Sequence, residues 1–350
     1  MRAWSVALVQ GEARIAEVGH DRVAFRLDDP RVEDPLVEAR DTVGIVGHEG
    51  GMVDSCHPAG PIMRLLVVNP YASAVDEERV AAVEVVLGDV EVARTERRGH
   101  ATELVRDARS AETIYVFSGD GVFNEVLNGL DSETPVGFLP GGGANVLTRA
   151  LGLPRDPVRA AERLARGRPR RISLGRVNDR RFGFAAGLGL DAEAVRRVEQ
   201  RGRSEEQGRA GNLVFAWDVA RLLAEARGRF EPVLEIAGRG RAAFALVANA
   251  DPYTYAGPLP LHVAPEARFE LGLDLVAPRK VSPLSLPRLL GYALLGRGQA
   301  GAADVIYGHD LDRIEITCDS ATPLQADGED LGDVTSAVFE AERGAVSVLV

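Results

Sequence analysis

The sequence predicts an α/β nucleotide-binding domain with a parallel sheet, followed by a C-terminal antiparallel β-sandwich domain. From residue 64 to about 155, apolar strand segments alternate with amphipathic helical segments across short loops, which is typical of a parallel sheet covered by helices. Beyond about residue 170, many short apolar segments follow one another with turns between them, which is typical of an antiparallel sandwich or barrel. A cleft between two such domains is the expected site.

Three parts are expected along the chain. Residues 1–62 form an N-terminal extension in which "DDPRVEDPLVEARD" and "VGHEGGMVDSCHPAGP" hold many breakers and little periodicity. This extension is expected to be disordered or not part of the native protein, with a small β-rich appendage as the alternative. Residues 63–165 are expected to form the α/β domain, and residues 166–350 the β-rich domain, whose last strand can return to the first domain.

Composition excludes several classes of protein. The formal net charge of −11 argues against broad binding to nucleic acid, which usually needs a basic face. Lys280 is the single lysine, so a GxxxxGK[ST] loop is absent and a phosphate site must use backbone N–H groups, arginine or metal. Cys56 and Cys318 are too few for a disulfide scaffold and fit a reducing cytoplasm. No apolar run approaches the roughly 18 residues of a spanning helix, so a cytoplasmic protein is expected, in contact with the inner face of a membrane at most.

The segment "IYVFSGDGVFNEVLNGL", residues 114–130, runs from an apolar strand through a glycine turn into a helix. Gly119 and Gly121 let the backbone turn tightly, and the helix N-terminus offers free N–H groups, so a phosphate fits there. Asp120 cannot face a phosphate without help, so its carboxylate suits Mg²⁺, a water on that metal, or a hydroxyl to be deprotonated. The alternative is that Asp120 is a surface turn residue and Glu125 a first-turn helix acid.

A second glycine turn of the same design follows in "VGFLPGGGANVLTRALGLP". Because adjacent parallel strands present their C-terminal loops at one edge, both loops can face the same ligand, and two such loops favour a nucleotide. Asn145 follows these glycines and is either a ligand contact or a helix N-cap. The three glycines are Gly141, Gly142 and Gly143. Further polar residues at strand ends, each also explained as a cap or turn residue, are Asn69, Thr95 and His100.

Two acidic positions stand out in the β-rich part. Asp191 follows the glycine-rich strand of "FGFAAGLGLDAEAVRRVE" at the start of a helix. Asp327-Gly328 in "PLQADGEDLG" is a strong hairpin signal between two strands, and such a turn can still deliver Glu329 to the cleft.

Five segments in this order resemble the catalytic family of diacylglycerol kinases and sphingosine kinases, and the resemblance runs over most of residues 63–350. They are "VVNPYAS", similar to the NPxxG strand; "SGDGVFNEVLNGL", similar to GGDGTxNEVxNGL; "LPGGGANVLTRALGLP", similar to PxGTxNDxAR; "FGFAAGLGLDAEAV", similar to GxGxDAxV; and "LQADGEDLG", similar to QxDGE. The resemblance implies a bacterial lipid kinase in which MgATP binds the α/β domain and phosphorylates a lipid hydroxyl, most simply of diacylglycerol, held by the β-rich domain.

The resemblance also implies roles for individual residues. Asp120 is the essential acid of the GDG loop and a candidate Mg²⁺ contact, Asp191 lies towards the acceptor, and Glu329 is a candidate base or metal contact. The expected nucleotide-binding residues are Asn69, Thr95, Gly119, Gly121, Asn124, Glu125, Gly141, Gly142, Gly143 and Asn145.

Three departures from the family pattern leave other functions open. Val122 stands where the family has threonine, Val146 where it has aspartate, and Ser73 where it has glycine, and these changes could lower ATP affinity or alter donor choice. One alternative is a soluble-metabolite kinase similar to NAD kinase, which would not need the QxDGE and GxDA segments. Another is a protein that binds nucleotide or lipid without catalysis. Which lipid is the acceptor depends on cleft shape, which these motifs do not encode.

One segment suggests contact with a lipid surface. "VSPLSLPRLLGYALLGRG" carries almost no charge before Arg297, and "RLARGRPRR" at residues 163–171 offers a cluster of arginines, so docking onto anionic lipid is one hypothesis. The alternative is that the leucines belong to the core and the arginines to a solvated face. The leucines are Leu284, Leu286, Leu289, Leu290, Leu294 and Leu295. The sequence also leaves a homodimer open.

Overall fold

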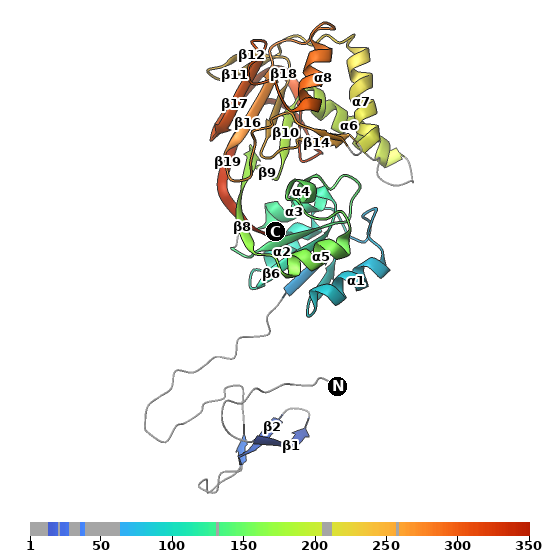
Figure 1. The fold of residues 1–350 in the computed structure, drawn as a ribbon, viewed down its shortest axis with the longest axis vertical. Coiled ribbons are helices and arrows are strands. Elements are labelled where there is room, and N and C mark those ends of the chain that lie inside the picture. Colours follow the sequence, from blue (N-terminus) through green and yellow to red (C-terminus); the bar gives the residue numbers. More distant parts are fainter. Residues whose placement is uncertain are drawn as a thin grey trace, which may run out of the picture. The chain divides into compact units, whose positions relative to one another are not determined.

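A computed structural model describes residues 13–19, 22–27, 36–38, 64–130, 133–204, 212–256 and 259–350. The chain divides into two units, Met1–Pro61 and Ile62–Val350 (Figure 1). The first unit contains three antiparallel strands in the order β1, β2, β3. Their bounds are β1 Ala13–Gly19, β2 Arg22–Leu27 and β3 Leu36–Glu38. Most of the predicted extension, residues 1–62, lies outside the described residues.

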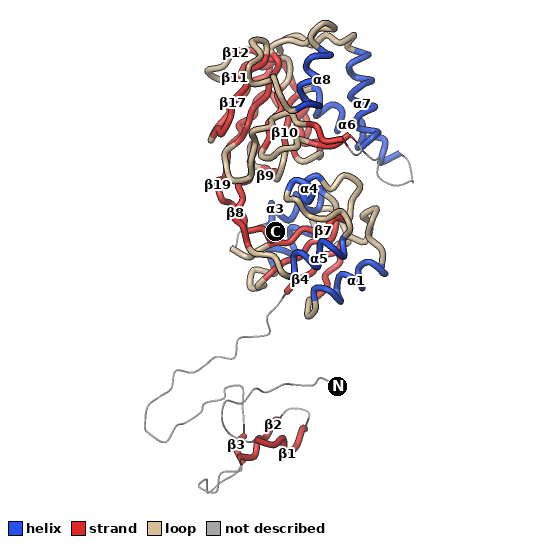
Figure 2. Tube along the Cα trace, viewed as in Figure 1, coloured by secondary structure: helices blue, strands red, loops and turns tan. Residues whose placement is uncertain are grey.

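The second unit begins with a parallel sheet in the strand order β7, β6, β4, β5, covered by helices (Figure 2). The strands read as continuous apolar runs because their two faces are buried, with Phe117 and Phe138 among the fully buried side chains. The strand bounds are β4 Arg64–Val68, β5 Glu91–Arg94, β6 Thr113–Ser118 and β7 Val136–Pro140. The helix bounds are α1 Glu77–Leu87, α2 His100–Asp107, α3 Asp120–Gly129, α4 Val146–Ala150 and α5 Pro157–Ala165.

The C-terminal half of the unit is built on antiparallel strands in the order β17, β16, β13, β10, β18, β19. The strand bounds are β8 Pro169–Val177, β9 Arg180–Phe182, β10 Ala185–Leu188, β11 Leu234–Ile236, β12 Gly240–Ala242, β13 Ala245–Ala248, β14 Thr254–Ala256, β15 Leu259–Leu261, β16 Leu273–Pro278, β17 Val305–Leu311, β18 Arg313–Ala326 and β19 Glu329–Leu349. The helix bounds are α6 Leu190–Ser204, α7 Asn212–Glu225 and α8 Leu286–Leu295. The predicted α/β domain followed by an antiparallel β domain is therefore confirmed.

The two halves share one sheet because strand β19 is long enough to serve both. Its first part pairs with β18, whereas its end pairs antiparallel with β8 and places Val348 opposite Val136 of the parallel strand β7. Further along β8, Gly175 lies opposite Ala341 of β19 and against the ring of Phe182 of β9, where a Cβ atom would come within 2.0 Å of the ring. A side chain larger than hydrogen does not fit beside this buried ring, so the pairing of β8 with β9 requires glycine here.

Removal of the first unit tests whether the second unit folds by itself. We expect a chain that begins at Met63 to keep the thermal unfolding midpoint of the full chain, because strand β4 starts the apolar core at Arg64. A chain that begins at Asn69 lacks the central strand β4 and is the control that must fail to fold. A fall of more than about 4 °C in the Met63 chain, roughly 1 kcal/mol or more of stability, would show instead that the removed residues pack on the core.

Candidate active site

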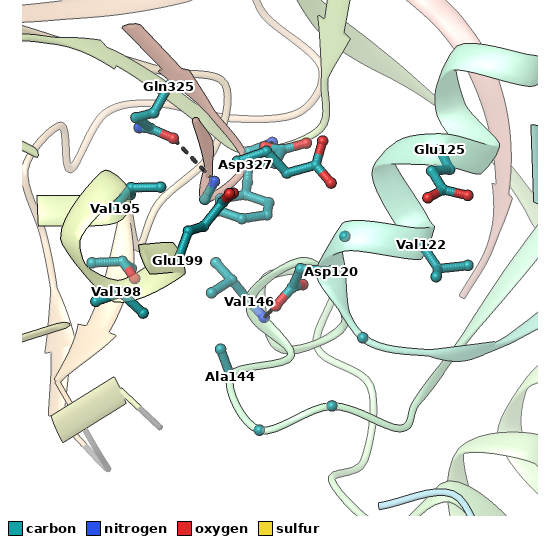
Figure 3. Close-up of a pocket in the computed structure, with 18 of the residues that line it drawn as sticks. Asp120, Val122, Glu125, Ala144, Val146, Val195, Val198, Glu199, Gln325 and Asp327 are labelled. Atoms are coloured by element: carbon teal, nitrogen blue, oxygen red, sulfur yellow. Dashed lines mark hydrogen bonds between the residues drawn. The ribbon is translucent and has the colours of Figure 1, made fainter. Parts of the chain in front are cut away.

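A cleft of about 580 Å³ lies between the parallel sheet and the antiparallel half of the second unit. One wall consists of the loops that follow β4, β5, β6 and β7, which are the carboxyl ends of the parallel strands. The other wall consists of α6, β14 and the turn between β18 and β19. Val195, Val198 and Glu199 of α6 lie across the cleft from Asp120 and Val146 (Figure 3). This is the edge at which open α/β sheets bind their ligands.

The two glycine loops touch each other, and this contact explains why glycine is needed in both. A Cβ atom on Gly142 would come within 2.7 Å of the Gly119 Cα atom, and one on Gly119 within 3.1 Å of the Gly142 Cα atom. Gly119 and Gly142 line the cleft, with Gly121 and Gly143 beside them. Their backbones can therefore approach a ligand from two neighbouring strands.

Asn145 closes the second glycine loop and is not part of the cleft lining. Its Oδ1 atom accepts the Gly142 N–H at 2.8 Å, and its Nδ2 atom donates to the Gly142 carbonyl at 2.6 Å. Its backbone has a φ of 51°, a left-handed conformation that asparagine tolerates better than most residues. The side chain therefore shapes the loop, which is a different use from the expected nucleotide contact and from a helix N-cap.

Asp120 lies at the first position of α3 and connects the two glycine loops. Its Oδ2 atom accepts the Val146 N–H at 3.0 Å, and its Oδ1 atom accepts the Leu147 N–H at 3.1 Å. The carboxylate thus satisfies the first free N–H groups of α4 while it lines the cleft. Burial raises the pKa of Asp120, and the backbone donors partly oppose this shift. The alternative interpretation, a surface turn residue, does not describe Asp120, because it begins helix α3 and the folding of one loop onto the other half-buries its side chain.

Asp191 is buried in a hydrogen-bonded cluster on the opposite wall. It accepts hydrogen bonds from the Tyr253 hydroxyl at 2.6 Å, from Gln325 Nε2 at 2.9 Å and from the Ala192 N–H at 2.9 Å. Burial raises the pKa of Asp191 and raises that of Tyr253 well above its ordinary value, so Tyr253 remains a protonated donor. The close approach of the carboxylate requires Gly187, since a Cβ atom there would lie 2.3 Å from Asp191 Oδ2.

Asp327 and Gly328 form the predicted hairpin turn, in which both residues have positive φ angles, 49° and 80°. The role of the Asp327 side chain could not be predicted from the hairpin motif. It accepts the N–H groups of Gly183, Phe184 and Ala185 at 2.5, 2.9 and 3.2 Å. Burial raises the pKa of Asp327 to about 6.

The fourth donor to Asp327 is Asn124 of α3, at 2.8 Å. Asn124 is buried and also donates to the Arg181 carbonyl at 2.9 Å, so it joins α3 to the antiparallel half. The structure therefore does not bring this expected nucleotide-binding residue to the cleft lining. In the sequence, an asparagine in a glycine-containing motif looks the same whether it binds a ligand or connects two parts of the fold. The connecting role of Asn124 could therefore not be predicted.

Glu329 follows the turn and lies at the cleft between two arginines. Its Oε2 atom is 2.8 Å from Arg180 Nη2, and its Oε1 atom is 3.3 Å from Arg98 Nη2. The same Oε1 atom would lie 3.5 Å from a Cβ atom on Gly121, so the carboxylate is beside the first glycine loop. Neither arginine was predicted, because each reaches Glu329 from a different part of the chain.

The remaining predicted residues divide into cleft and non-cleft positions. Asn69, Thr95 and Glu125 are buried and line the cleft, and the Oε2 atom of Glu125 has no hydrogen-bond partner among the described residues. His100 is outside the lining, and its Nδ1 atom accepts the Glu96 N–H at 3.1 Å at the start of α2. Val122 and Val146 also line the cleft, where they add apolar surface.

The donor set fits Mg²⁺ that arrives with a nucleotide. Mg²⁺ in kinases is usually held by one or two carboxylates together with the phosphates of the substrate. No group of three or more metal-ligating side chains occurs among the described residues. Each Asp120 oxygen accepts one N–H and keeps a further lone pair, so this carboxylate can contact the ion when phosphates supply the other ligands.

Because Asp120 accepts two N–H groups of α4, its replacement is expected to lower the stability of the fold. Asparagine has one side-chain oxygen, so in Asp120→Asn only one of the two N–H groups of α4 keeps its acceptor. The amide NH₂ group then faces the other N–H group. We expect a loss of about 1–2 kcal/mol in urea unfolding, because one N–H group of α4 is left without an acceptor. Asp156→Asn is the matched control, since Asp156 caps α5 through one bond that asparagine reproduces. Equal stability of the two variants would contradict the capping role of Asp120.

Comparison with known proteins agrees with the family resemblance that the sequence motifs indicate. Residues 64–177 match the family model of the diacylglycerol kinase catalytic domain. A diacylglycerol kinase of Bacillus subtilis (strain 168) is 39% identical over 26% of this chain and 32% of its own length. One of Staphylococcus saprophyticus is 39% identical over 29% of this chain and 38% of its own length. The chain thus spans well under two thirds of the length of these curated relatives.

Solved structures share the fold over a larger part of the chain. A diacylglycerol kinase from Bacillus anthracis str. Sterne superposes with a TM-score of 0.61 at 19% identity, over 82% of this chain and 96% of its own. At this identity the superposition supports the fold alone. The resemblance of this chain to the diacylglycerol kinase catalytic family, first indicated by its motifs, is confirmed by the family model and by these relatives.

Proposed function

We propose that the protein is an ATP-dependent lipid kinase that transfers the γ-phosphoryl group to a lipid hydroxyl, with diacylglycerol as the acceptor. The observation that carries this proposal is the placement of Glu329 beside Gly121 of a phosphate-type loop, in one cleft with Asp191 and Tyr253. Donor loops, a carboxylate and a polar acceptor cluster therefore share one cavity, as an in-line transfer requires.

The donor side relies on backbone N–H groups. The glycine loops leave the main chain open to the cleft, and the first turn of α3 adds N–H groups without intrahelical partners. Mg²⁺ bound with ATP would neutralise charge on the phosphates. The capping bonds of Asp120 use the N–H groups of residues 146 and 147, so valine at position 146 preserves them.

The acceptor side combines an apolar wall with one polar end. Phe184, Val195 and Val198 line it next to Asp191 and Tyr253. Such a lining suits a molecule that has a hydrocarbon part and a hydroxyl, and it favours a lipid over the soluble acceptor of an NAD-kinase-like enzyme. Glu329 would accept the hydroxyl proton as the oxygen attacks the γ-phosphorus, while the bond from that phosphorus to the bridging oxygen breaks and ADP leaves. The Asp191 carboxylate, which accepts from Tyr253 and Gln325, would hold the polar end of the acceptor wall in place.

A labelled-phosphate assay tests this function. With [γ-³²P]ATP, Mg²⁺ and a panel of diacylglycerol, a sphingoid base and NAD⁺, we expect label in diacylglycerol. Label in NAD⁺ alone would favour the soluble-metabolite kinase. Nucleotide binding without label in any acceptor would favour the non-catalytic alternative.

Glu329→Gln tests the base within the same assay. We expect turnover to fall roughly 10²-fold or more, the usual scale for a positioned base, while the protein stays folded. Glu342→Gln is the matched control, because Glu342 lies on the same strand between Arg176 and Arg181 but outside the cleft. Full turnover in Glu329→Gln would move the base role to Asp120.

A lipid acceptor also requires access to a lipid surface, for which we propose peripheral contact through helix α8. No helix in the described part of the chain is long and apolar enough to cross a membrane. Leu284, Leu294 and Leu295 are exposed by 94%, 52% and 65%, so part of the predicted leucine set is not core. Leu286 and Leu289 instead pack against buried residues of the antiparallel half, which makes them unsuitable for testing a surface role.

The arginine cluster at residues 163–171 does not adjoin these leucines. It belongs to α5 and β8, at the opposite end of the unit from α8 (Figure 1), and Arg170 and Arg171 already pair with Glu270 and Glu133. Contact through α8 is therefore proposed without this cluster.

Vesicle sedimentation tests the α8 contact. We expect Leu294→Asp to lower the fraction of protein that sediments with anionic phospholipid vesicles, because a charge replaces apolar surface at the interface. Val85→Asp on α1 is the control, since Val85 is also open to solvent, at 82% exposure, but lies on a different helix. Equal sedimentation of wild type and Leu294→Asp would show that α8 does not contact the lipid.

A further inference from the structure

We propose that Arg98 is a phosphate-binding residue of the cleft, which exchanges its ion pair with Glu329 for the terminal phosphate of the bound nucleotide. The proposal rests on the proposed function in one respect, namely that the phosphoryl donor is a nucleoside triphosphate. It assigns a positive charge to a site that has no P-loop lysine, since Lys280 pairs with Glu231 outside the cleft lining.

Arg98 lies where a terminal phosphate would meet a side chain. It belongs to the loop between β5 and α2, at the carboxyl end of the parallel sheet, and lines the cleft together with both glycine loops. Through Glu329 Oε1, which is 3.3 Å from its Nη2 atom, it adjoins the position of Gly121. A phosphate on the Gly121 backbone would therefore lie within a side chain's length of the guanidinium group.

Arg98 is also more weakly held than the neighbouring arginine of the cleft lining. Its side chain is 64% exposed and its contact with Glu329 is long, so this ion pair contributes little free energy. Its neighbour Arg97, which also lines the cleft, is held by Glu103 at 2.5 Å. A guanidinium group forms stronger, charge-assisted and often bidentate hydrogen bonds with a phosphate, so exchange of partners is favourable.

The exchange does not leave Glu329 as an unpaired charge. Arg180 keeps its 2.8 Å bond to Oε2, and its strand β9 is anchored to β8. Departure of Arg98 exposes only Oε1, the oxygen that faces Gly121. Binding of the triphosphate would therefore uncover the oxygen that the proposed reaction uses, and do so only when the donor is present.

Calorimetric titration with MgATP, MgADP and AMP tests the assignment. We expect Arg98→Gln to weaken MgATP binding by about tenfold or more and to leave AMP binding unchanged, because a terminal phosphate contact is lost and the nucleoside contacts stay. Arg98→Lys should restore part of the MgATP affinity, since lysine keeps the positive charge but cannot form the bidentate hydrogen bonds of a guanidinium group. Arg94→Gln, which removes an arginine paired with Glu77 outside the cleft, is the control for general charge loss and should bind like wild type.

A second variant tests the exchange itself. Glu329→Gln frees Arg98 and should tighten MgATP binding several-fold in the wild-type background, but by less in the Arg98→Gln background. Equal tightening in both backgrounds, or full MgATP affinity in Arg98→Gln, would overturn the proposal. The proposed function fails separately: if wild type binds MgATP but labels no lipid, the kinase assignment is wrong while the Arg98 result still stands.

Discussion

The hydrogen bonding of the buried Asp327 carboxylate is the interaction on which the rest of the candidate active site depends. Its four hydrogen bonds connect the β18–β19 turn to Asn124 of helix α3 and to the backbone of residues 183–185. Because α3 carries the first glycine loop and the turn carries Glu329, this buried acid sets the position of the proposed base relative to the donor loop. A buried carboxylate without these donors would be strongly unfavourable, so all of its partners must be in place at once.

Most acidic and amide side chains of the motifs have a structural task in addition to any chemical one. Asp120 caps α4, Asn145 closes the second glycine loop, and Asp191 orients Tyr253 and Gln325. Gln325 in turn accepts the Gly328 N–H at 3.0 Å, which links the acceptor cluster to the turn beside Glu329. The cleft is therefore held by a connected set of polar contacts, and a substitution in it changes geometry as well as charge.

The acceptor and donor walls meet because strand β19 spans both halves of the unit. Its pairing with β8 and with β7 makes one continuous sheet, which joins the two halves whose loops and helices line the cleft. Helix α8, in contrast, has no buried residue and leaves leucines exposed beside the antiparallel half. The proposed active site and the proposed lipid contact therefore lie on different elements of the unit.

Local pattern by itself determined the alternation of strands and helices, the two glycine turns and the Asp327-Gly328 hairpin, because each depends on residues close together in the chain. Family resemblance added the roles expected of Asp120, Asp191 and Glu329. Only the tertiary structure decided that Asn124 forms a joint, that Asp120 is a cap, and that Arg98 and Arg180 flank Glu329. These contacts join residues that are 26 to 231 positions apart, and no periodicity or spacing encodes which distant side chains the folded sheet brings within hydrogen-bonding distance.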